Sequence, residues 1–185
     1  MTGGVDVGQV NTESVAFRAE IADFGAFYEE TYDRAYRTAL GIVRDPALAA
    51  DVTQEAYVSA YRQRDQFRGD APSRAWLHRI VVHGALSALR RQKKVTRDVD
   101  LAPLLVPDTA FHTTSRLVLL DALDSLPARH RAAVILRYYH DYDYTTIARI
   151  LETSTTNVGA MLSRALDKLK VALDPIPGAA HETGR

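Results

Sequence analysis

The chain has 185 residues, of which 46% are hydrophobic and 25% charged, and this suits one ordinary globular domain or two small ones. It contains no cysteine, which excludes disulfides, thiolate metal sites and cysteine nucleophiles. No apolar run approaches the ~20 residues of a membrane span, and the N-terminus lacks the basic-then-apolar pattern of a signal peptide. We therefore expect a cytoplasmic protein without membrane insertion.

The net charge of zero conceals a strong segregation of charge along the chain. Residues 1–60 carry 4 basic and 10 acidic side chains, whereas residues 61–97 carry 10 basic and 2 acidic ones. Such a split predicts one surface for a polyanion and another for a basic protein partner. It also predicts that the molecule as a whole is only weakly attracted to DNA.

The first part of the chain predicts a flexible leader followed by amphipathic helices. Residues 1–16 are Gly-rich, polar and without periodicity. From Phe17 to Val43, apolar residues recur at three- and four-residue steps, and Asp45-Pro46 then interrupts the helix. A second helix is predicted from Ala47 to Arg62. The residues expected to face packing partners in it are Val52, Ala56, Val58 and Ala60.

Asp51, Gln54 and Glu55 form a polar, acidic face of that second helix. Their position has a purely structural explanation, because carboxylates near a helix N-terminus interact favourably with the helix dipole. The pattern alone does not separate this explanation from a binding surface.

The stretch from Phe67 to Lys94 combines a turn with a two-faced helix. The turn ends at Ser73, which can cap a helix that runs past Arg91. The apolar side of this helix is formed by Leu77, Val81, Val82, Ala85, Ala88 and Leu89. The opposite side gathers Arg79, His83, Arg90 and Lys94, with Trp76 at its edge. This face suits a phosphate backbone and an unstacked base, although a solvated helix face beside a buried Trp shows the same pattern.

Residues 95–115 contain two Pro and three Asp without a sustained period, which predicts an extended linker. A second helical module then begins near Arg116 with a leucine stripe that stops at Pro127. Further helices are predicted at Ala128–Tyr139, Tyr144–Leu151 and Thr155–Leu173, with a frayed tail over 174–185. Asp143 is expected to cap the helix that begins at Tyr144, and Glu152-Thr153-Ser154 is expected to form a tight turn.

The last two helices have the pattern of a helix-turn-helix. Ala148 is the small residue that permits close crossing of the helices. The apolar positions that would lock the second helix are Ile147, Leu151, Val158 and Leu162. Its N-terminal residues, Thr155, Thr156, Asn157 and Ala160, would then lie at base edges in the major groove, with Arg164 and Lys168 toward phosphates. Any compact helical hairpin shares part of this pattern.

Taken in order, these segments resemble a sigma factor of the extracytoplasmic-function group, the two-domain promoter-recognition subunits of bacterial RNA polymerase. In the first half the resemblance is carried by Asp51–Tyr57, Phe67–Asp70, Ala75–Ile80 and Leu89–Arg91. In the second half it is carried by Leu123–Pro127, Leu136–Tyr138, Tyr144–Ala148 and Leu162–Ala165. A single such motif is weak evidence, but the ordered set over about residues 20–172 is specific.

The resemblance implies an all-α fold with two small helical domains, at 17–94 and 116–173, joined by the linker at 95–115. It implies that core RNA polymerase contacts Asp51, Gln54 and Glu55 through the coiled coil of its largest subunit, and the second domain through its flap. It implies that the −10 element is melted and held by Arg68, Gly69, Asp70, Ser73, Trp76, Arg79, His83, Arg90, Arg91 and Lys94. It implies that the −35 element is read by Thr155, Thr156, Asn157, Ala160, Met161, Arg164 and Lys168. Many members also have an anti-sigma protein as a partner, and the resemblance implies no catalytic residue and no cofactor.

The sequence departs from the family pattern at several positions. Gly159 and Met161 stand where Lys and Arg are frequent, and His83 stands where Asn is frequent. Glu152 occupies a turn position that favours Gly, where it would carry about 1 kcal/mol of left-handed strain unless the turn differs. These departures bear on the promoter sequence rather than on the architecture. A free-standing helix-turn-helix regulator and a purely helical interaction protein are the alternative readings, but the regulator leaves the acidic first helices unexplained.

Overall fold

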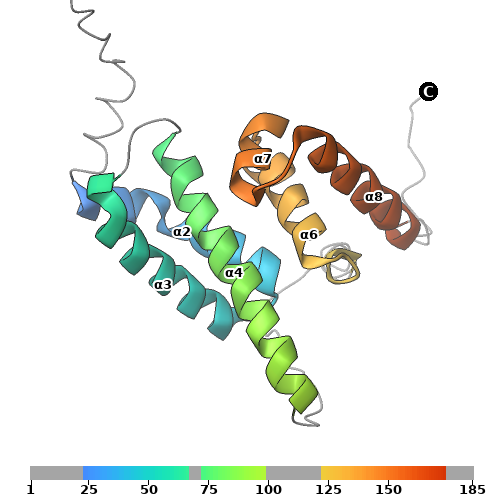
Figure 1. The fold of residues 1–185 in the computed structure, drawn as a ribbon, viewed down its shortest axis with the longest axis horizontal. Helices are drawn as coiled ribbons and strands as arrows, with labels where there is room; N and C mark the ends of the chain where they lie inside the picture. Colours follow the sequence, from blue (N-terminus) through green and yellow to red (C-terminus); the bar gives the residue numbers. More distant parts are fainter. Residues whose placement is uncertain (1–22, 67–71, 99–121, 174–185) are drawn as a thin grey trace, which may run out of the picture.

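The computed structural model describes residues 23–66, 72–98 and 122–173, and every regular element in these ranges is helical (Figure 1). The predicted all-α fold is therefore confirmed. The helices form two groups. In the first, α2 (Phe24–Val43) and α3 (Pro46–Gln63) pack against α4 (Ser73–Asp98). In the second, α6 (Ala128–Val134), α7 (Tyr144–Leu151) and α8 (Thr155–Leu173) lie across α4 from α3 (Figure 1). We call the groups the first module (α2, α3, α4) and the second module (residues 122–173).

The first module begins with two helices separated by the predicted break. The helix α2 (Phe24–Val43) ends at Arg44, whose left-handed backbone, with φ of 63°, directs its N–H to the carbonyl oxygen of Leu40 at 2.8 Å. Asp45 then caps α3 (Pro46–Gln63) by accepting a 2.9 Å hydrogen bond from the N–H of Leu48. Pro46 fits at the first helical position because its missing N–H would have no partner there. A short 3₁₀ turn, η1 (Arg64–Gln66), follows α3.

The long helix α4 packs against both α2 and α3. Its predicted apolar side is confirmed: Leu77, Val81, Val82, Ala85 and Ala88 are buried, and Leu89 packs against the core. Two boundaries differ from prediction. The helix includes Ser73 as its first residue, and it continues to Asp98, so that the first residues of the predicted linker are helical. Residues 85–98 contain neither Gly nor Pro, and nothing in them terminates the helix earlier.

One core prediction in the first module is wrong. Val58 is 45% exposed, whereas Val52, Ala56 and Ala60 are buried as expected. Val58 follows Gln54 by four residues, so both lie on the same outward face of α3.

The second module contains α6 (Ala128–Val134), η2 (Ile135–Tyr139), α7 (Tyr144–Leu151) and α8 (Thr155–Leu173). The predicted helix at Ala128–Tyr139 has the expected extent, but η2 is a π-helical turn in which the N–H of His140 bonds to the carbonyl oxygen of Ile135 at 3.3 Å. Asp143 caps α7 as predicted, accepting from the N–H of Thr146 at 2.7 Å. The bounds of α7 and α8 agree with the prediction.

The two modules are in direct contact through α4 with α7 and α2 with α6. Gly41 of α2 allows this approach, because a Cβ atom at that position would lie 2.7 Å from Cδ1 of Ile135. Among the described residues, the two modules are therefore packed against each other in one closed form (Figure 1).

Candidate functional surfaces

The outer face of α3 carries the acidic residues singled out in the sequence. Asp51, Gln54 and Glu55 are all exposed and line a shallow depression on this helix. Val58 adds an apolar spot among them. Arg91 of α4 borders this face, with its Nη2 atom 4.0 Å from Oε2 of Glu55. A face with carboxylates around an exposed apolar side chain suits a protein partner with basic and apolar side chains.

Beside the acidic face lies an aromatic groove between α2 and α3. It is lined by Phe24, Tyr28, Tyr32, Tyr57 and Tyr61, together with Gln54 and Val58. Within it, the Tyr57 hydroxyl lies 2.7 Å from Oγ1 of Thr31, and burial raises the pKa of Tyr57 to about 12. The aromatic periodicity of α2 predicted a helix, but it did not distinguish these partly exposed rings from a buried core.

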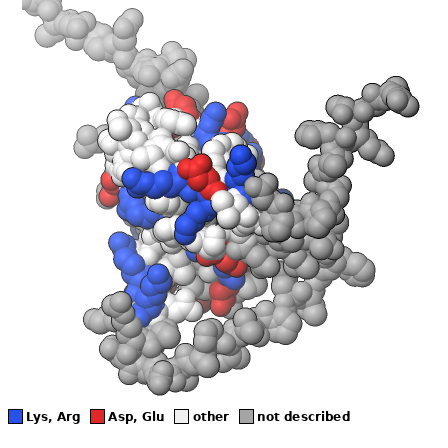
Figure 2. Space-filling model, turned by 90° about the vertical axis from the view of Figure 1, so that its right-hand side faces the viewer, with Lys and Arg blue, Asp and Glu red and all other residues white. Residues whose placement is uncertain are grey.

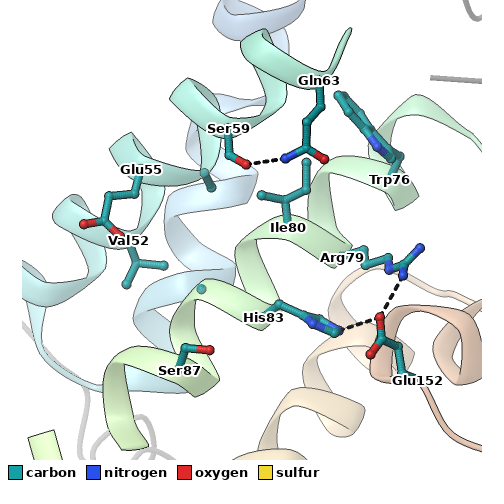
Figure 3. Close-up of a pocket in the computed structure, with 12 residues that line it drawn as sticks. Val52, Glu55, Ser59, Gln63, Trp76, Arg79, Ile80, His83, Ser87 and Glu152 are labelled. Carbon is teal, nitrogen blue, oxygen red and sulfur yellow. Dashed lines mark hydrogen bonds and ion pairs between the residues drawn. The ribbon is translucent and has the colours of Figure 1, made fainter. Parts of the chain in front are cut away.

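The basic side of α4 lines a groove of about 500 Å³ between α3 and α4 (Figure 3). Trp76, Arg79 and His83 all contribute to it, as predicted from their shared face. Arg90 and Arg91 are exposed further along the helix, and Arg90 donates to the Ser87 hydroxyl at 2.9 Å. Ser73 is buried, so it does not belong to this surface. Arg68, Gly69, Asp70 and the side chain of Lys94 lie outside the described residues.

The second module covers one end of this basic face. Nη2 of Arg79 donates to Oε1 of Glu152 at 2.7 Å, and Nε2 of His83 lies 3.9 Å from the same oxygen (Figure 3). His83 also donates from Nε2 to the carbonyl oxygen of Ile150 at 2.9 Å. The hydrogen bond from Arg79 and the charge of His83 lower the pKa of Glu152. Sequence reasoning missed this contact, because it joins residues that are far apart in the chain.

Glu152 sits in the turn between α7 and α8 with the left-handed backbone that the sequence predicted as one alternative. Its φ is 49°, and the N–H of Thr153 reaches back to the carbonyl oxygen of Ala148 at 3.0 Å. A non-glycine residue in this conformation costs about 1 kcal/mol. The predicted locking residues Ile147, Leu151, Val158 and Leu162 are all buried, as in a helix-turn-helix.

The N-terminal end of α8 presents polar side chains to solvent. Thr155, Thr156 and Asn157 are exposed, and Ser154 caps the helix by accepting from the N–H of Asn157 at 3.2 Å. The Asn157 amide also donates to Oγ1 of Thr153 at 2.7 Å. Ala160 is partly exposed. These groups can donate and accept hydrogen bonds at base edges.

Other predicted residues of α8 divide between surface and core. Arg164 and Lys168 are exposed one and two turns further along the helix. Basic side chains spread over the described part of the face drawn in Figure 2, with acidic ones between them. Met161, however, is only 5% exposed, so its assignment to the DNA-reading face is wrong. It lies three residues after the buried Val158, on the side of α8 that packs on the rest of the module.

A cluster of aromatic rings joins the two modules. Nδ1 of His78 lies 2.8 Å from the Tyr142 hydroxyl, and Nε2 of His140 lies 2.7 Å from Oγ1 of Thr38. Burial, followed by the nearby His140 and Arg34, holds the pKa of His78 well below its usual value. Burial, with Arg34, lowers the pKa of His140 to about 4. Both imidazoles are therefore neutral at neutral pH.

Within the described ranges, no group of three or more His, Cys, Asp or Glu side chains is arranged to hold a metal ion. None of the helices described combines the length and apolar character needed to cross a bilayer.

Comparison with known proteins agrees with this division into two helical modules. Residues 27–95 match the family model of Sigma-70 region 2, and residues 116–169 match that of Sigma-70, region 4. The RNA polymerase sigma factor SigV of Bacillus subtilis is 31% identical over 75% of this chain and 83% of its own length. The ECF RNA polymerase sigma factor SigL of Mycobacterium tuberculosis is 31% identical over 88% of this chain and 96% of its own.

Solved structures show the same fold. The sigma factor RpoE of Bartonella quintana, in complex with the anti-sigma factor NepR, aligns with a TM-score of 0.72 and 21% identity over 83% of this chain and 98% of that one. CnrH, in complex with the cytosolic domain of CnrY, aligns with a TM-score of 0.65 and 22% identity over 89% of this chain and 98% of that one.

The chain therefore belongs to the sigma-70 family of RNA polymerase sigma factors, in its extracytoplasmic-function group. Members of this family are non-catalytic transcription factors that bind core RNA polymerase and promoter DNA. The function of the chain is to direct promoter-specific initiation of transcription, and the alternative of a free-standing regulator is not favoured.

Proposed function

We propose that the exposed face of α3 binds polymerase, that the exposed face of α4 binds the −10 element and that the exposed face of α8 binds the −35 element. The observation that carries the proposal is the separation of charge: α3 exposes carboxylates, whereas α4 and α8 expose cations and hydrogen-bonding side chains. The boundaries of the domains are proposed at 17–94 and 116–173.

On α3, Asp51, Gln54 and Glu55 are proposed to bind the coiled coil of the polymerase's largest subunit. Their exposure and the neighbouring Val58 support this role. The flap of the polymerase is proposed to bind the second module.

On α4, Trp76, Arg79 and His83 are proposed to hold the −10 strand, continued by Arg90 and Arg91. Unstacking a base costs a few kcal/mol, which stacking on an aromatic side chain and capture of the flipped base offset. Trp76 supplies an indole beside the Arg79 guanidinium in the same groove. The loop with Arg68, Gly69 and Asp70 is proposed to take part in that capture.

On α8, Thr155, Thr156 and Asn157 are proposed to read the −35 element in the major groove, and Arg164 and Lys168 to contact phosphates. An Asn side chain pairs well with adenine, and Thr can hydrogen-bond a base or contact a thymine methyl. The apolar side chains buried between α7 and α8 support this role, because they fix the orientation of α8 relative to the rest of the module.

The polymerase is proposed to perform all of the nucleotidyl transfer, so that the chain itself is no enzyme. It is proposed to act in the cytoplasm, where its polymerase works. An anti-sigma protein is proposed as an inhibitory partner. The two structural relatives are described in complex with such a protein or with a partner's cytosolic domain, which supports the proposal.

The experiment that tests these assignments separates polymerase binding from promoter opening. Asp51→Ala with Glu55→Ala should weaken binding to core polymerase about tenfold or more, whereas Arg79→Ala with Arg90→Ala should leave that binding intact and reduce open complexes. Asp33→Ala with Asp167→Ala removes two exposed carboxylates outside the α3 face and serves as the control. Equal permanganate footprints for the arginine variant and the parent would refute the assignment of α4.

A further inference from the structure

The groove between α3 and α4 has a polar wall opposite its basic one. Gln63, the last residue of α3, is exposed and lines the groove together with Trp76 and Ile80 of α4. Ser59, one turn earlier in α3, lines it as well. Neither Ser59 nor Gln63 belongs to the predicted −10 residues, which were drawn from the face of α4 and the loop before it. The groove therefore offers a hydrogen-bonding group on the helix that faces the indole.

The carboxamide of Gln63 is held in one orientation. Its Nε2 atom donates to Oγ of Ser59 at 2.7 Å (Figure 3). This bond leaves Oε1 turned to the side of the groove on which Trp76 lies (Figure 3). Among the described residues, Oε1 has no hydrogen-bond partner. Because a carboxamide oxygen accepts hydrogen bonds through two lone pairs, Oε1 is an acceptor available to a ligand in the groove.

The two walls of the groove are held at a fixed spacing by the packing of α3 on α4. A Cβ atom at Gly84 would already be in van der Waals contact with Cγ1 of Val52, at 3.4 Å. Val52 and Ala56, which lie beneath the groove on α3, are buried. Groups carried by packed helices are positioned more precisely than groups carried by loops. Gln63 and Trp76 therefore have a defined placement relative to each other.

A nucleobase is the ligand that matches this arrangement. Its face can stack on the indole of Trp76 while its edge reaches Oε1 of Gln63. Arg79 follows Trp76 by about one helical turn and supplies a cation for the phosphate. The groove has a volume of about 500 Å³, within the ~300–1,000 Å³ that is usual for small-molecule sites.

An acceptor at the position of Oε1 distinguishes among the bases. Adenine and cytosine carry an exocyclic amino donor on the edge that pairs, whereas guanine and thymine carry a carbonyl oxygen at the equivalent position, which would repel Oε1. Of the two amino bases, adenine has the larger ring system to stack on an indole, and Gln pairs well with adenine. The groove therefore favours adenine.

We propose that Gln63, held by Ser59, selects adenine in the non-template strand of the −10 element by accepting a hydrogen bond from its exocyclic amino group. This inference deepens the proposed role of the α4 groove in holding the −10 strand and rests on it. Ser59 is a positioning residue, because it contacts Gln63 rather than the base.

The test uses the holoenzyme, formed from core polymerase and the full chain, on a promoter probe whose −10 region is already single-stranded. The −10 sequence is first obtained by selection from randomised promoters with the parent chain. At each −10 position in turn, the non-template strand then carries either adenine or unsubstituted purine, which lacks only the exocyclic amino group. The ratio of the two affinities measures the contribution of that group.

Three variants and a matched control separate the acceptor from the rest of the groove. Gln63→Leu removes both polar atoms at similar size, whereas Gln63→Glu keeps an acceptor. Ser59→Ala removes the group that orients the carboxamide. Gln92→Leu makes the same exchange at an exposed position of α4 outside the groove and is the control.

In the parent, adenine should bind about three- to tenfold more tightly than purine at one −10 position. Gln63→Leu should abolish this ratio, Gln63→Glu should keep it and Ser59→Ala should reduce it, whereas Gln92→Leu should leave it unchanged. A parent that shows no such position, or a Gln63→Leu variant with the ratio of the parent, would overturn the proposal. Equal binding of the single-stranded probe by the parent and by Arg79→Ala with Arg90→Ala would instead refute the proposed role of α4.

Discussion

The imidazole rings of His78 and His140 lie with their centroids 3.9 Å apart at the contact between the two modules. Each ring belongs to a different module, and each makes a hydrogen bond across the interface, His78 to Tyr142 and His140 to Thr38. Two imidazoles this close are compatible only when at least one is neutral. The closed form therefore disfavours proton uptake by these two rings.

Acid should open the protein before it unfolds either module. Burial lowers the pKa of both imidazoles, and the charged groups that face them are Arg34 from α2 and Arg74 from α4. Separation of the modules would expose the rings and return their pKa values toward 6.5, so the open form binds more protons below that pH. The stability of the closed form is thus fully present above about pH 6.5 and is lost as the pH falls toward 4.

We expect the ratio of open to closed protein to rise at least tenfold between pH 7.5 and pH 5, measured by electron spin resonance distances between labels attached through Glu29→Cys on α2 and Ser163→Cys on α8. A His140→Asn variant, which cannot titrate at this position, should show a smaller rise in the ratio of open to closed protein over the same pH range. A distance distribution that stays the same over this range would contradict the assignment of the histidine pair.

Tyr57→Phe should destabilise the first module by about 1 kcal/mol, because it removes a buried hydrogen bond to Thr31. Urea denaturation followed by circular dichroism measures the change. Tyr61→Phe is the matched control, since Tyr61 is 51% exposed and its loss of a hydroxyl should change stability by about 0.5 kcal/mol or less. Equal effects of the two substitutions on the free energy of unfolding would show that the Tyr57 hydroxyl does not stabilise the first module.

Asp143→Ala should destabilise the second module by about 0.5–2 kcal/mol through loss of the cap on α7. Hydrogen bonds from Thr146 lower the pKa of Asp143, so this stabilisation is present above the ordinary value of 3.8 and is lost as the pH falls through the lowered pKa. Thermal unfolding at pH 7 measures the difference. An unchanged melting temperature would rule out the capping role.

Asn157→Ala should relax the base preference at one position of the −35 element by about 1–3 kcal/mol, if this residue reads adenine. Its effect on the α8 helix should be small, because the side-chain amide of Asn157 bonds within the turn, to Thr153, and the substitution keeps the backbone N–H that donates to Ser154. Selection from randomised promoters with core polymerase measures the preference. Ser163→Ala, at an exposed position further along α8, should leave the preference intact.

The parts of the fold that could be predicted from the sequence are those fixed by neighbouring residues. The break at Asp45-Pro46, the cap at Asp143 and the turn at Glu152 each depend on contacts within about one helical turn. The exposed faces of α3 and α4 followed from the helical period for the same reason.

The parts that could not be predicted depend on how the two modules meet. The contact of Arg79 with Glu152 and the stacking of His78 on His140 join residues that no local pattern connects. Val58 and Met161 show a related difficulty. An apolar residue near the edge of a helix face can be either exposed, as Val58 is, or buried, as Met161 is. Their environment is decided by packing partners elsewhere in the chain.

The most direct test of the central claim is reconstitution of the purified chain with bacterial core RNA polymerase on a library of promoters. We predict that the chain associates with the core enzyme and that transcripts start from a defined subset of promoters only when it is present. A chain that fails to associate with core polymerase, or that leaves its promoter selection unchanged, would contradict the account.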